Sequence, residues 1–141
     1  MSLGTLTPEF NAHLFRCRDG SPIPPAALVR LQGLHVALLA LLAYARDPAG
    51  GNRPDAQLEV LSGWRSSMYN MRVGGAKHSQ HVLGTAADIT IAGVLPGKVQ
   101  AWVDLLQRDG RMPPGGLGRY PGFTHVDVRG ELARWTGKKG A

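Results

Sequence analysis

The sequence predicts an α+β domain, because two helical patterns and several short strand patterns alternate along a chain of ordinary globular composition. The chain has 141 residues, of which 43% are hydrophobic and 18% are charged. That length suits one domain with its own hydrophobic core, so residues 1–141 are expected to form a single domain. We expect a helical part over about residues 1–50 and a part that carries the chemistry over about residues 58–135.

The first helix is predicted over residues 26–47. Prolines precede it, where their fixed φ suits a helix start, and leucines recur at positions 28, 31, 38 and 42. His35 falls on the same stripe and is expected to be a core residue. The apolar stretch within this helix, "GLHVALLALLAYA", has 13 residues. Because a bilayer-spanning helix needs about 20, we expect no transmembrane segment.

The middle of the chain alternates between strand and helix patterns. Alternating apolar and polar residues predict short strands over residues 57–63 and 86–91, and in the second of these Asp88 lies on the face opposite Ile89. Between them, residues 66–76 are expected to form a short helix that starts at a Ser cap and ends at a Gly pair.

A second amphipathic helix is predicted over residues 95–110, with an inward face made of Val99, Trp102, Leu105 and Leu106. Residues 113–130 then hold two short strands around a "YPGF" turn. In the second strand, His125, Asp127 and Arg129 share one face because alternate residues point the same way. Three ionisable groups in a row suit either a solvated face or a polar site.

The charge of the chain points to an anionic partner. Sixteen Lys and Arg residues against ten Asp and Glu give a net charge of +6 and a pI near 10.1, which favours nucleic acid or an anionic envelope polymer. The basic residues are scattered, however, and aromatic residues make up only 6% of the chain. Nucleic-acid binding calls for a clustered basic stripe or stacking aromatics, so we expect no nucleic-acid partner.

Candidate metal ligands are confined to histidines and carboxylates. Cys17 is the only cysteine in the sequence, which excludes an internal disulfide and a thiolate zinc cluster. Six residues separate His81 from Asp88, with Gly84 between them, so a loop His and a strand Asp can converge on one point. His125 from a neighbouring strand completes a His-Asp-His set. Catalytic zinc is typically held by three protein ligands, and its fourth coordination position is left open for water or substrate.

Three ordered motifs in this region resemble those of the zinc D-Ala-D-Ala carboxypeptidase family. "SQHVLGTAAD", residues 79–88, fits the S-x-H-x-x-G-x-A-x-D motif, and "FTHVD", residues 123–127, fits the H-x-D motif. "SGWRSS", residues 62–67, resembles the S-G-[YW]-R-S stretch that precedes them. The resemblance covers roughly residues 58–135, and the end of this region is similar to that of a small, compact branch of the family.

The resemblance implies a fold, a cofactor and an activity. The fold is the hedgehog/DD-peptidase fold, a small antiparallel sheet flanked by helices, and the zinc ligands are His81, Asp88 and His125. The implied enzyme is a zinc metallopeptidase, a D,D-carboxypeptidase or murein endopeptidase, that cleaves peptide bonds in peptidoglycan stem peptides or cross-links through zinc-activated water. The alternative is a non-catalytic module of the same type that keeps the metal and binds cell wall or serves in a virion. We expect a monomer.

The resemblance also suggests how substrate is bound. Arg65 matches the family Arg that binds a substrate carboxylate, a task that suits a guanidinium because it forms two parallel hydrogen bonds. Ser79 is a candidate for hydrogen bonding to the substrate peptide, or a residue that caps the loop. The aromatic residues that could either wall the cleft or belong to the core are Trp64, Tyr120 and Trp135, and His78 is expected at the rim.

Asp127 is the candidate catalytic base, because it shares a strand face with His125. Better-known branches of the family carry an acid three residues before the last ligand, or a His two residues before it. This sequence has Gly122 and Phe123 at those positions. The other interpretation of Asp127 is a hydrogen-bond acceptor that orients a ligand imidazole. Both interpretations remain open from the sequence.

The start of the sequence, "MSLGTLTPEFNAHLF", lacks the basic and apolar regions of a secretory signal, so we expect no export signal in this chain. The implied substrate places the action at the bacterial cell wall or in the periplasm. The missing signal fits a phage or prophage lysin, which reaches the wall through a membrane lesion.

Overall fold

The centre of the fold is a six-stranded sheet with the strand order β1-β2-β3-β5-β4-β6, in a computed structural model that describes residues 1–138. The strands are β1 (Gly4–Thr5), β2 (Leu58–Ser62), β3 (Ala86–Ile91), β4 (Gly116–Arg119), β5 (Thr124–Asp127) and β6 (Ala133–Thr136). Neighbouring strands are antiparallel except β4 and β6, which run parallel. The α+β prediction is confirmed, and the sheet is antiparallel apart from this one pair.

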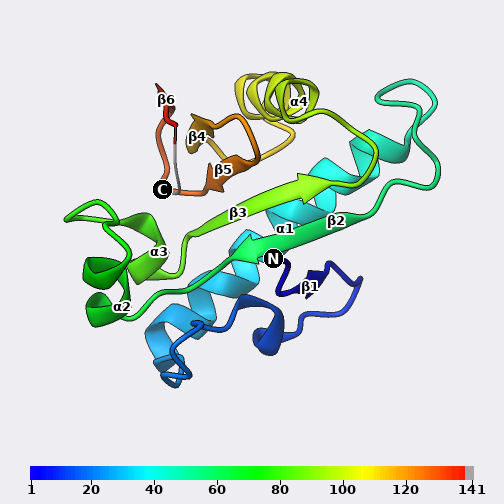
Figure 1. Ribbon diagram of the computed structural model, residues 1–141. Coiled ribbons are helices and arrows are strands. Elements are labelled where there is room, and N and C mark those ends of the chain that lie inside the picture. Colours follow the sequence, from blue (N-terminus) through cyan, green and yellow to red (C-terminus); the bar gives the residue numbers. More distant parts are fainter. Residues whose placement is uncertain (139–141) are drawn as a thin grey trace.

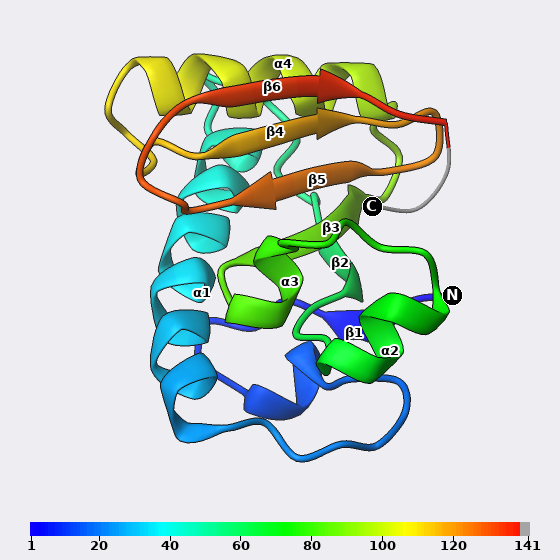
Figure 2. The ribbon, with the colours of Figure 1, turned by 90° about the vertical axis from the view of Figure 1, so that its left-hand side faces the viewer.

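Helices cover the sheet and close one of its ends. They are the 3₁₀ helix η1 (Ala12–Phe15) and the α-helices α1 (Pro25–Arg46), α2 (Ser67–Arg72), α3 (Gln80–Leu83) and α4 (Pro96–Arg108). In Figure 1, α1 passes behind β2 and β3, and the short helices α2 and α3 lie together where β3 begins. Figure 2 shows α4 running beside β4 and β6, across the end of α1.

The predicted first helix is confirmed as α1, which is a core helix. Pro25 stands at its first turn, where its missing N–H costs nothing. By length and composition α1 could cross a membrane, since one 18-residue window has a mean hydropathy of 1.8. In this fold, however, Leu31, Leu34, Leu38 and Leu41 are completely buried. His35 is also buried, and its Nε2 lies 2.8 Å from the carbonyl oxygen of Thr7.

The predicted second helix is confirmed as α4, with one correction to its inward face. Val99, Trp102 and Leu106 are buried, whereas Leu105 is 43% exposed. Val99, Trp102 and Leu106 follow one another at intervals of three and four residues, while Leu105 lies one residue off this stripe. Gln100, Val103 and Gln107 are also buried, so the buried side of α4 is rotated away from Leu105 relative to the predicted face.

The first residues of the chain form part of the sheet, so residues 1–50, where a helical part was expected, also include a strand. Gly4 and Thr5 form β1 and pair with Val60 and Glu59 of β2. A strand of two residues has no alternation to recognise, so its pairing depends on the neighbouring strand rather than on a local pattern. The N-terminal part thus shares one sheet with the chemistry-bearing part.

Candidate metal centre

Two of the three candidate ligands face each other across adjacent strands. The antiparallel pairing of β3 with β5 places Asp88 directly opposite His125. Directly opposed residues of an antiparallel pair have their side chains about 4.5–5.5 Å apart at Cβ and on the same face. The hydrogen bonds of the sheet therefore set the spacing of these two side chains.

The third candidate, His81, comes from α3. The sequence suggested a loop, but residues 80–83 form one helical turn. Ser79 caps this turn, because its Oγ accepts a hydrogen bond from the backbone N–H of His81 at 3.1 Å. Gly84 ends it in the left-handed conformation, with φ 87°. The cap and the glycine together fix where His81 points.

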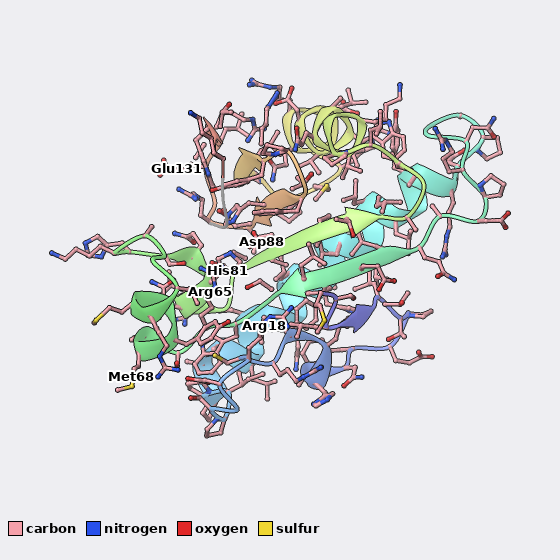
Figure 3. All side chains as sticks on the ribbon, in the orientation of Figure 1. Arg18, Arg65, Met68, His81, Asp88 and Glu131 are labelled. Atoms are coloured by element: carbon pink, nitrogen blue, oxygen red, sulfur yellow. The ribbon has the colours of Figure 1, made fainter. Side chains whose placement is uncertain are left out.

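The three side chains converge on one buried point. Nε2 of His81 and Nδ1 of His125 each lie 3.3 Å from Oδ1 of Asp88. The three candidate ligand atoms all lie within 4.8 Å of one another, and each residue is at most 4% exposed. Figure 3 shows His81 and Asp88 gathered with Arg65 at the start of β3.

The same three atoms lack hydrogen-bond partners in the part of the chain that the structure describes. Nε2 of His81, Oδ1 of Asp88 and Nδ1 of His125 are buried and make no hydrogen bond. A buried polar atom without a partner carries a substantial free-energy cost. Two imidazole nitrogens and a carboxylate oxygen are a donor set that zinc accepts. The residues present thus fit a metal ion that would satisfy all three atoms at once.

Each imidazole is oriented by a hydrogen bond at its other nitrogen. Nδ1 of His81 lies 2.8 Å from the carbonyl oxygen of Gly63, which can only accept a hydrogen bond. Nε2 of His125 lies 2.8 Å from Oδ2 of Asp127. With a proton on these outer nitrogens, the inner nitrogens keep their lone pairs for a metal ion.

Asp127 is enclosed by hydrogen-bond donors. It is completely buried, and besides His125 it accepts hydrogen bonds from the backbone N–H of Gly116 and from Arg129. Arg129 donates three times, through its backbone N–H at 3.1 Å, its Nε at 3.0 Å and its Nη2 at 2.7 Å. These five hydrogen bonds occupy both carboxylate oxygens. This environment fits an acceptor that orients His125 and leaves little capacity to take a proton from water.

The electrostatics of the cluster favour carboxylates that are ionised. Burial alone would raise the pKa of Asp88, but the two imidazoles outweigh it and hold that pKa below its usual range. Burial would likewise raise the pKa of Asp127, and the hydrogen bonds from His125 and Arg129 lower it instead. For His125, burial works against the charged form, yet the hydrogen bond to Asp127 and the nearby negative charge of Asp88 raise its pKa.

Arg65 is buried beside Asp88. Its Nη2 lies 3.5 Å from Oδ2 of Asp88, its Nη1 donates to Oδ1 of Asn70 at 3.2 Å, and its Nε donates to Oγ of Ser62 at 3.3 Å. Arg65 and Asp88 also line a cavity of about 200 Å³, together with Arg18, Leu61, Ser62, Tyr69, Val73 and Phe123. The guanidinium thus supports a candidate ligand and reaches the wall of a cavity.

A second cavity, of about 250 Å³, opens on the other two candidate ligands. His81 and His125 line it with Ala76, His78, Ser79, Gln80, Tyr120, Arg129 and Trp135. Of the three aromatic candidates, Tyr120 and Trp135 belong to this wall. Trp64 instead lies in the core, 5% exposed, with its Nε1 donating to the carbonyl oxygen of Val82.

Two groups that support the candidate ligands were given no role from the sequence. The carbonyl of Gly63 is a backbone group, and no residue type signals its role. Arg129 was placed on the same face as His125 and Asp127, since alternate residues of a strand point the same way, but its bonds to Asp127 were not foreseen. Arg129 donates to Asp127, and its guanidinium carbon lies 5.2 Å from the ring centre of Trp135. These contacts hold Arg129 in the wall of the second cavity.

Comparisons with known proteins agree with this geometry. A Haemophilus influenzae protein named probable peptidoglycan L,D-endopeptidase MepK is 40% identical to this chain over 90 residues. The match covers 59% of this chain and 45% of that protein, so the chain spans less than half the length of this relative. The model of the Peptidase M15 family matches residues 32–127, a range that includes His81, Asp88 and His125. This chain therefore belongs to the Peptidase M15 family.

Proposed function

We propose that this protein is a zinc-dependent hydrolase that cleaves peptide bonds in the stem peptides or cross-links of peptidoglycan. The observation that carries the proposal is the set of three buried, unpartnered ligand atoms of His81, Asp88 and His125. Membership of a peptidase family and the relative named as a peptidoglycan endopeptidase supply the reaction and the substrate. The proposed place of action is the bacterial cell wall or periplasm, and the proposed active form is a monomer.

His81, Asp88 and His125 would hold the zinc ion. When bound, zinc would act as a Lewis acid that polarises the scissile carbonyl and lowers the pKa of a water molecule, so that the water can lose a proton and attack at neutral pH. The chain supplies the orientation of the site: Gly63 fixes the tautomer of His81, and Asp127 fixes that of His125. We assign Asp127 this positioning role in preference to that of the base, since its oxygens already accept five hydrogen bonds.

The catalytic base would then be another side chain that reaches the cavity lined by His81 and His125. His78 lines the cavity shared by His81 and His125 and is exposed, so solvent and substrate can reach its imidazole. An imidazole can both accept and donate a proton, which suits a catalytic base. We propose His78 as the base. Glu131, on the segment between β5 and β6, is the second candidate (Figure 3).

Substrate contacts are proposed for Arg65 and Ser79. Arg65 lines the cavity beside Asp88, where its guanidinium can hold a carboxylate of the stem peptide. Ser79 lines the other cavity, but its Oγ already accepts the N–H of His81. The hydroxyl of Ser79 could therefore contact substrate only as a donor, while its oxygen continues to cap α3.

An endopeptidase fits the site better than a carboxypeptidase. The candidate ligands border two cavities, one reached by Asp88 and the other by His81 and His125. A substrate that crosses the metal centre would have room on both sides of the scissile bond, as cleavage within a cross-link requires. The relative's name, an L,D-endopeptidase, supports the same choice and suggests L,D bonds.

The test is the incubation of purified sacculi with the zinc-loaded protein, followed by mass spectrometry of the released muropeptides. We expect new peptide termini, and their masses identify the bond. A chelator, or the variant Asp88→Ala, should abolish the products, while Asp55→Ala, a change in a surface loop, should leave them unchanged. Tight zinc binding and adsorption to sacculi without new termini would instead indicate a non-catalytic wall-binding module.

A further inference from the structure

We propose that Tyr120 is a catalytic residue whose hydroxyl donates a hydrogen bond to the carbonyl oxygen of the scissile peptide. The inference rests on the proposed peptidase function and adds a residue to it. Tyr120 lines the same cavity of about 250 Å³ as His81 and His125. Its side chain comes from the end of β4 and is 8% exposed.

The ring of Tyr120 is held in place by its neighbours. It stacks on the ring of Phe123, with ring centroids 4.5 Å apart and ring planes 11° from parallel. Its backbone carbonyl accepts a hydrogen bond from Nε2 of Gln100 at 3.1 Å. A Cβ at Gly137 would lie 2.2 Å from the ring, so a glycine there leaves room for it. A group held this firmly loses little entropy when it meets a substrate.

Trp135 sets the direction of the Tyr120 hydroxyl. Its Nε1 donates to the Tyr120 hydroxyl oxygen at 3.0 Å. Trp135 also lies beside a candidate ligand: its ring centre is 4.8 Å from that of His125, and both residues are in register with Gly118 of β4. A Cβ at Gly118 would lie 2.7 Å from the indole, so glycine permits this approach. Trp135 therefore links Tyr120 to His125 through two short contacts.

The proton of the Tyr120 hydroxyl remains available for substrate. Indole N–H is a donor only, so the hydrogen bond from Trp135 uses a lone pair of the Tyr120 oxygen and leaves its O–H unused. Among residues 1–138, no protein group accepts that O–H. Because Tyr120 lines the cavity, we infer that this O–H donates to a substrate bound there.

The chemistry of amide cleavage uses such a donor. As water adds to the carbonyl carbon, the carbon–oxygen double bond becomes a single bond and negative charge collects on the oxygen. A fixed donor aimed at that oxygen stabilises the charge more than it stabilises the neutral carbonyl, which accelerates the reaction. The hydroxyl keeps its proton throughout, so this role needs no further acid or base.

The first test compares Tyr120→Phe with Tyr44→Phe on muropeptides. Tyr120→Phe removes one oxygen atom and keeps the stacked ring, so we expect kcat to fall by about 100-fold to about 1,000-fold, with KM, zinc content and Tm near those of the wild type. Tyr44 packs against Trp102, away from the candidate ligands, and its variant should retain full turnover. Equal turnover by both variants and the wild type would overturn the assignment.

A binding measurement keeps the inference testable even if the proposed peptidase activity fails. A peptide phosphinate carries tetrahedral, negatively charged oxygens in place of the scissile carbonyl. Calorimetry on the zinc-loaded proteins should show that Tyr120→Phe weakens its affinity at least about 10-fold, while Tyr44→Phe does not. Equal affinities for the two variants, or no binding by the wild type, would refute the role of Tyr120, whatever the muropeptide assay gives.

A second variant tests the link to Trp135. Trp135→Phe removes the N–H that directs the hydroxyl and should weaken phosphinate binding by less than Tyr120→Phe does. The double variant should bind phosphinate about as weakly as Tyr120→Phe alone, because both changes act through the same hydroxyl. Additive losses in the double variant would show that Trp135 acts on the site independently, and the directing role would be wrong.

Discussion

Oδ2 of Asp127 lies 2.8 Å from Nε2 of His125 and 2.7 Å from Nη2 of Arg129, so one carboxylate oxygen joins a candidate metal ligand to a guanidinium. The opposite nitrogen of His125 faces Asp88 and His81. Because the hydrogen bond at Nε2 leaves a lone pair on Nδ1, we propose that Asp127 acts on the candidate metal centre through the imidazole that separates them.

Asp127→Asn is expected to weaken zinc binding. The amide keeps the shape of the side chain, but it loses the negative charge that stabilises the Nε2 proton of His125. We expect zinc affinity to fall by about 10-fold to about 100-fold, with activity largely restored by excess zinc. Competition titration with a fluorescent chelator measures the affinity. A loss of activity of about 100-fold to about 10,000-fold with zinc still bound would instead identify Asp127 as the base.

The apparent zinc affinity should depend on pH in a range set by His125. Zinc binds the neutral imidazole, so a proton on His125 competes with it. Since the hydrogen bond to Asp127 and the negative charge of Asp88 raise the pKa of His125, we expect the affinity to decline with falling pH already above about 6.5, the usual value for histidine. Calorimetric titrations at several pH values test this. An affinity that stays constant until well below pH ~6.5 would contradict it.

The raised pKa of His125 also predicts that the stability of the metal-free protein falls as the pH rises. The pKa of His125 is higher in the folded protein than in the unfolded chain, where it is about 6.5. Protonated His125 therefore stabilises the fold fully below pH about 6.5, and this stabilisation is lost as the pH rises through the pKa of the folded state. The Tm of the chelator-treated protein should therefore decrease with rising pH in this window, while the Tm of the zinc-loaded protein should not. If the Tm of both forms changed with pH in the same way, the raised pKa of His125 would be contradicted.

Arg65→Lys separates binding of a substrate carboxylate from support of Asp88. Lysine keeps the charge but loses the planar fork, so it cannot keep the contacts to Asp88 and Asn70 and also reach the cavity. If Arg65 holds substrate as proposed, KM should rise about 10-fold or more, with zinc affinity within about 3-fold of the wild type. A matched fall in Tm, zinc affinity and turnover would show that Arg65 only supports Asp88.

Gly84→Ala should destabilise the turn that carries His81. Gly84 has φ 87°, and an added Cβ would lie 2.7 Å from the carbonyl oxygen of Ala27 in α1. The strain of φ and the overpacking together should lower the free energy of unfolding by roughly 2–5 kcal/mol. Gly74→Ala is the matched control, because Gly74 has φ 72° and open space around its Cβ.

Urea denaturation of the two variants measures the difference between them. Gly74→Ala carries only the backbone strain, so its loss should be about 1–2 kcal/mol. We also expect Gly84→Ala to weaken zinc binding, because a displaced α3 would move His81, whereas Gly74→Ala should not. Similar losses for both variants would show that α1 and α3 can separate without cost.

The long periodic elements and the set of candidate ligands could be predicted from the sequence. Leucine spacing predicted α1 and alternation of apolar and polar residues predicted β3, because helices and strands repeat with periods of 3.6 and 2 residues. His81, Asp88 and His125 were singled out by residue type and spacing, and the fold brings their ligand atoms within 4.8 Å of one another. The direct opposition of Asp88 and His125 could not be predicted, since register is set by pairing across distant segments.

The two strands that the sequence did not reveal, β1 and β6, lie at the edges of the sheet. β1 has two residues, too few to show alternation. β6 alternates apolar and polar residues over only four positions, and no tight turn like the "YPGF" turn between β4 and β5 marks it. The roles of Trp64 and Trp135 also stayed open, because composition cannot tell a core indole from one that walls a cavity. The surroundings of the two indoles differ because of strand pairing: β6 pairs with β4, which places Trp135 beside His125.

The opposition of Asp88 and His125 across β3 and β5 bears on the order in which the protein is assembled. Small zinc modules fold only when the ion gathers ligands that are otherwise far apart. Here the backbone hydrogen bonds of the sheet, and a core that includes Ile89 and Val126 on these two strands, bring two ligands together without an ion. We therefore expect the scaffold to form first, so that protein made where zinc is scarce would be folded and able to take up the ion later.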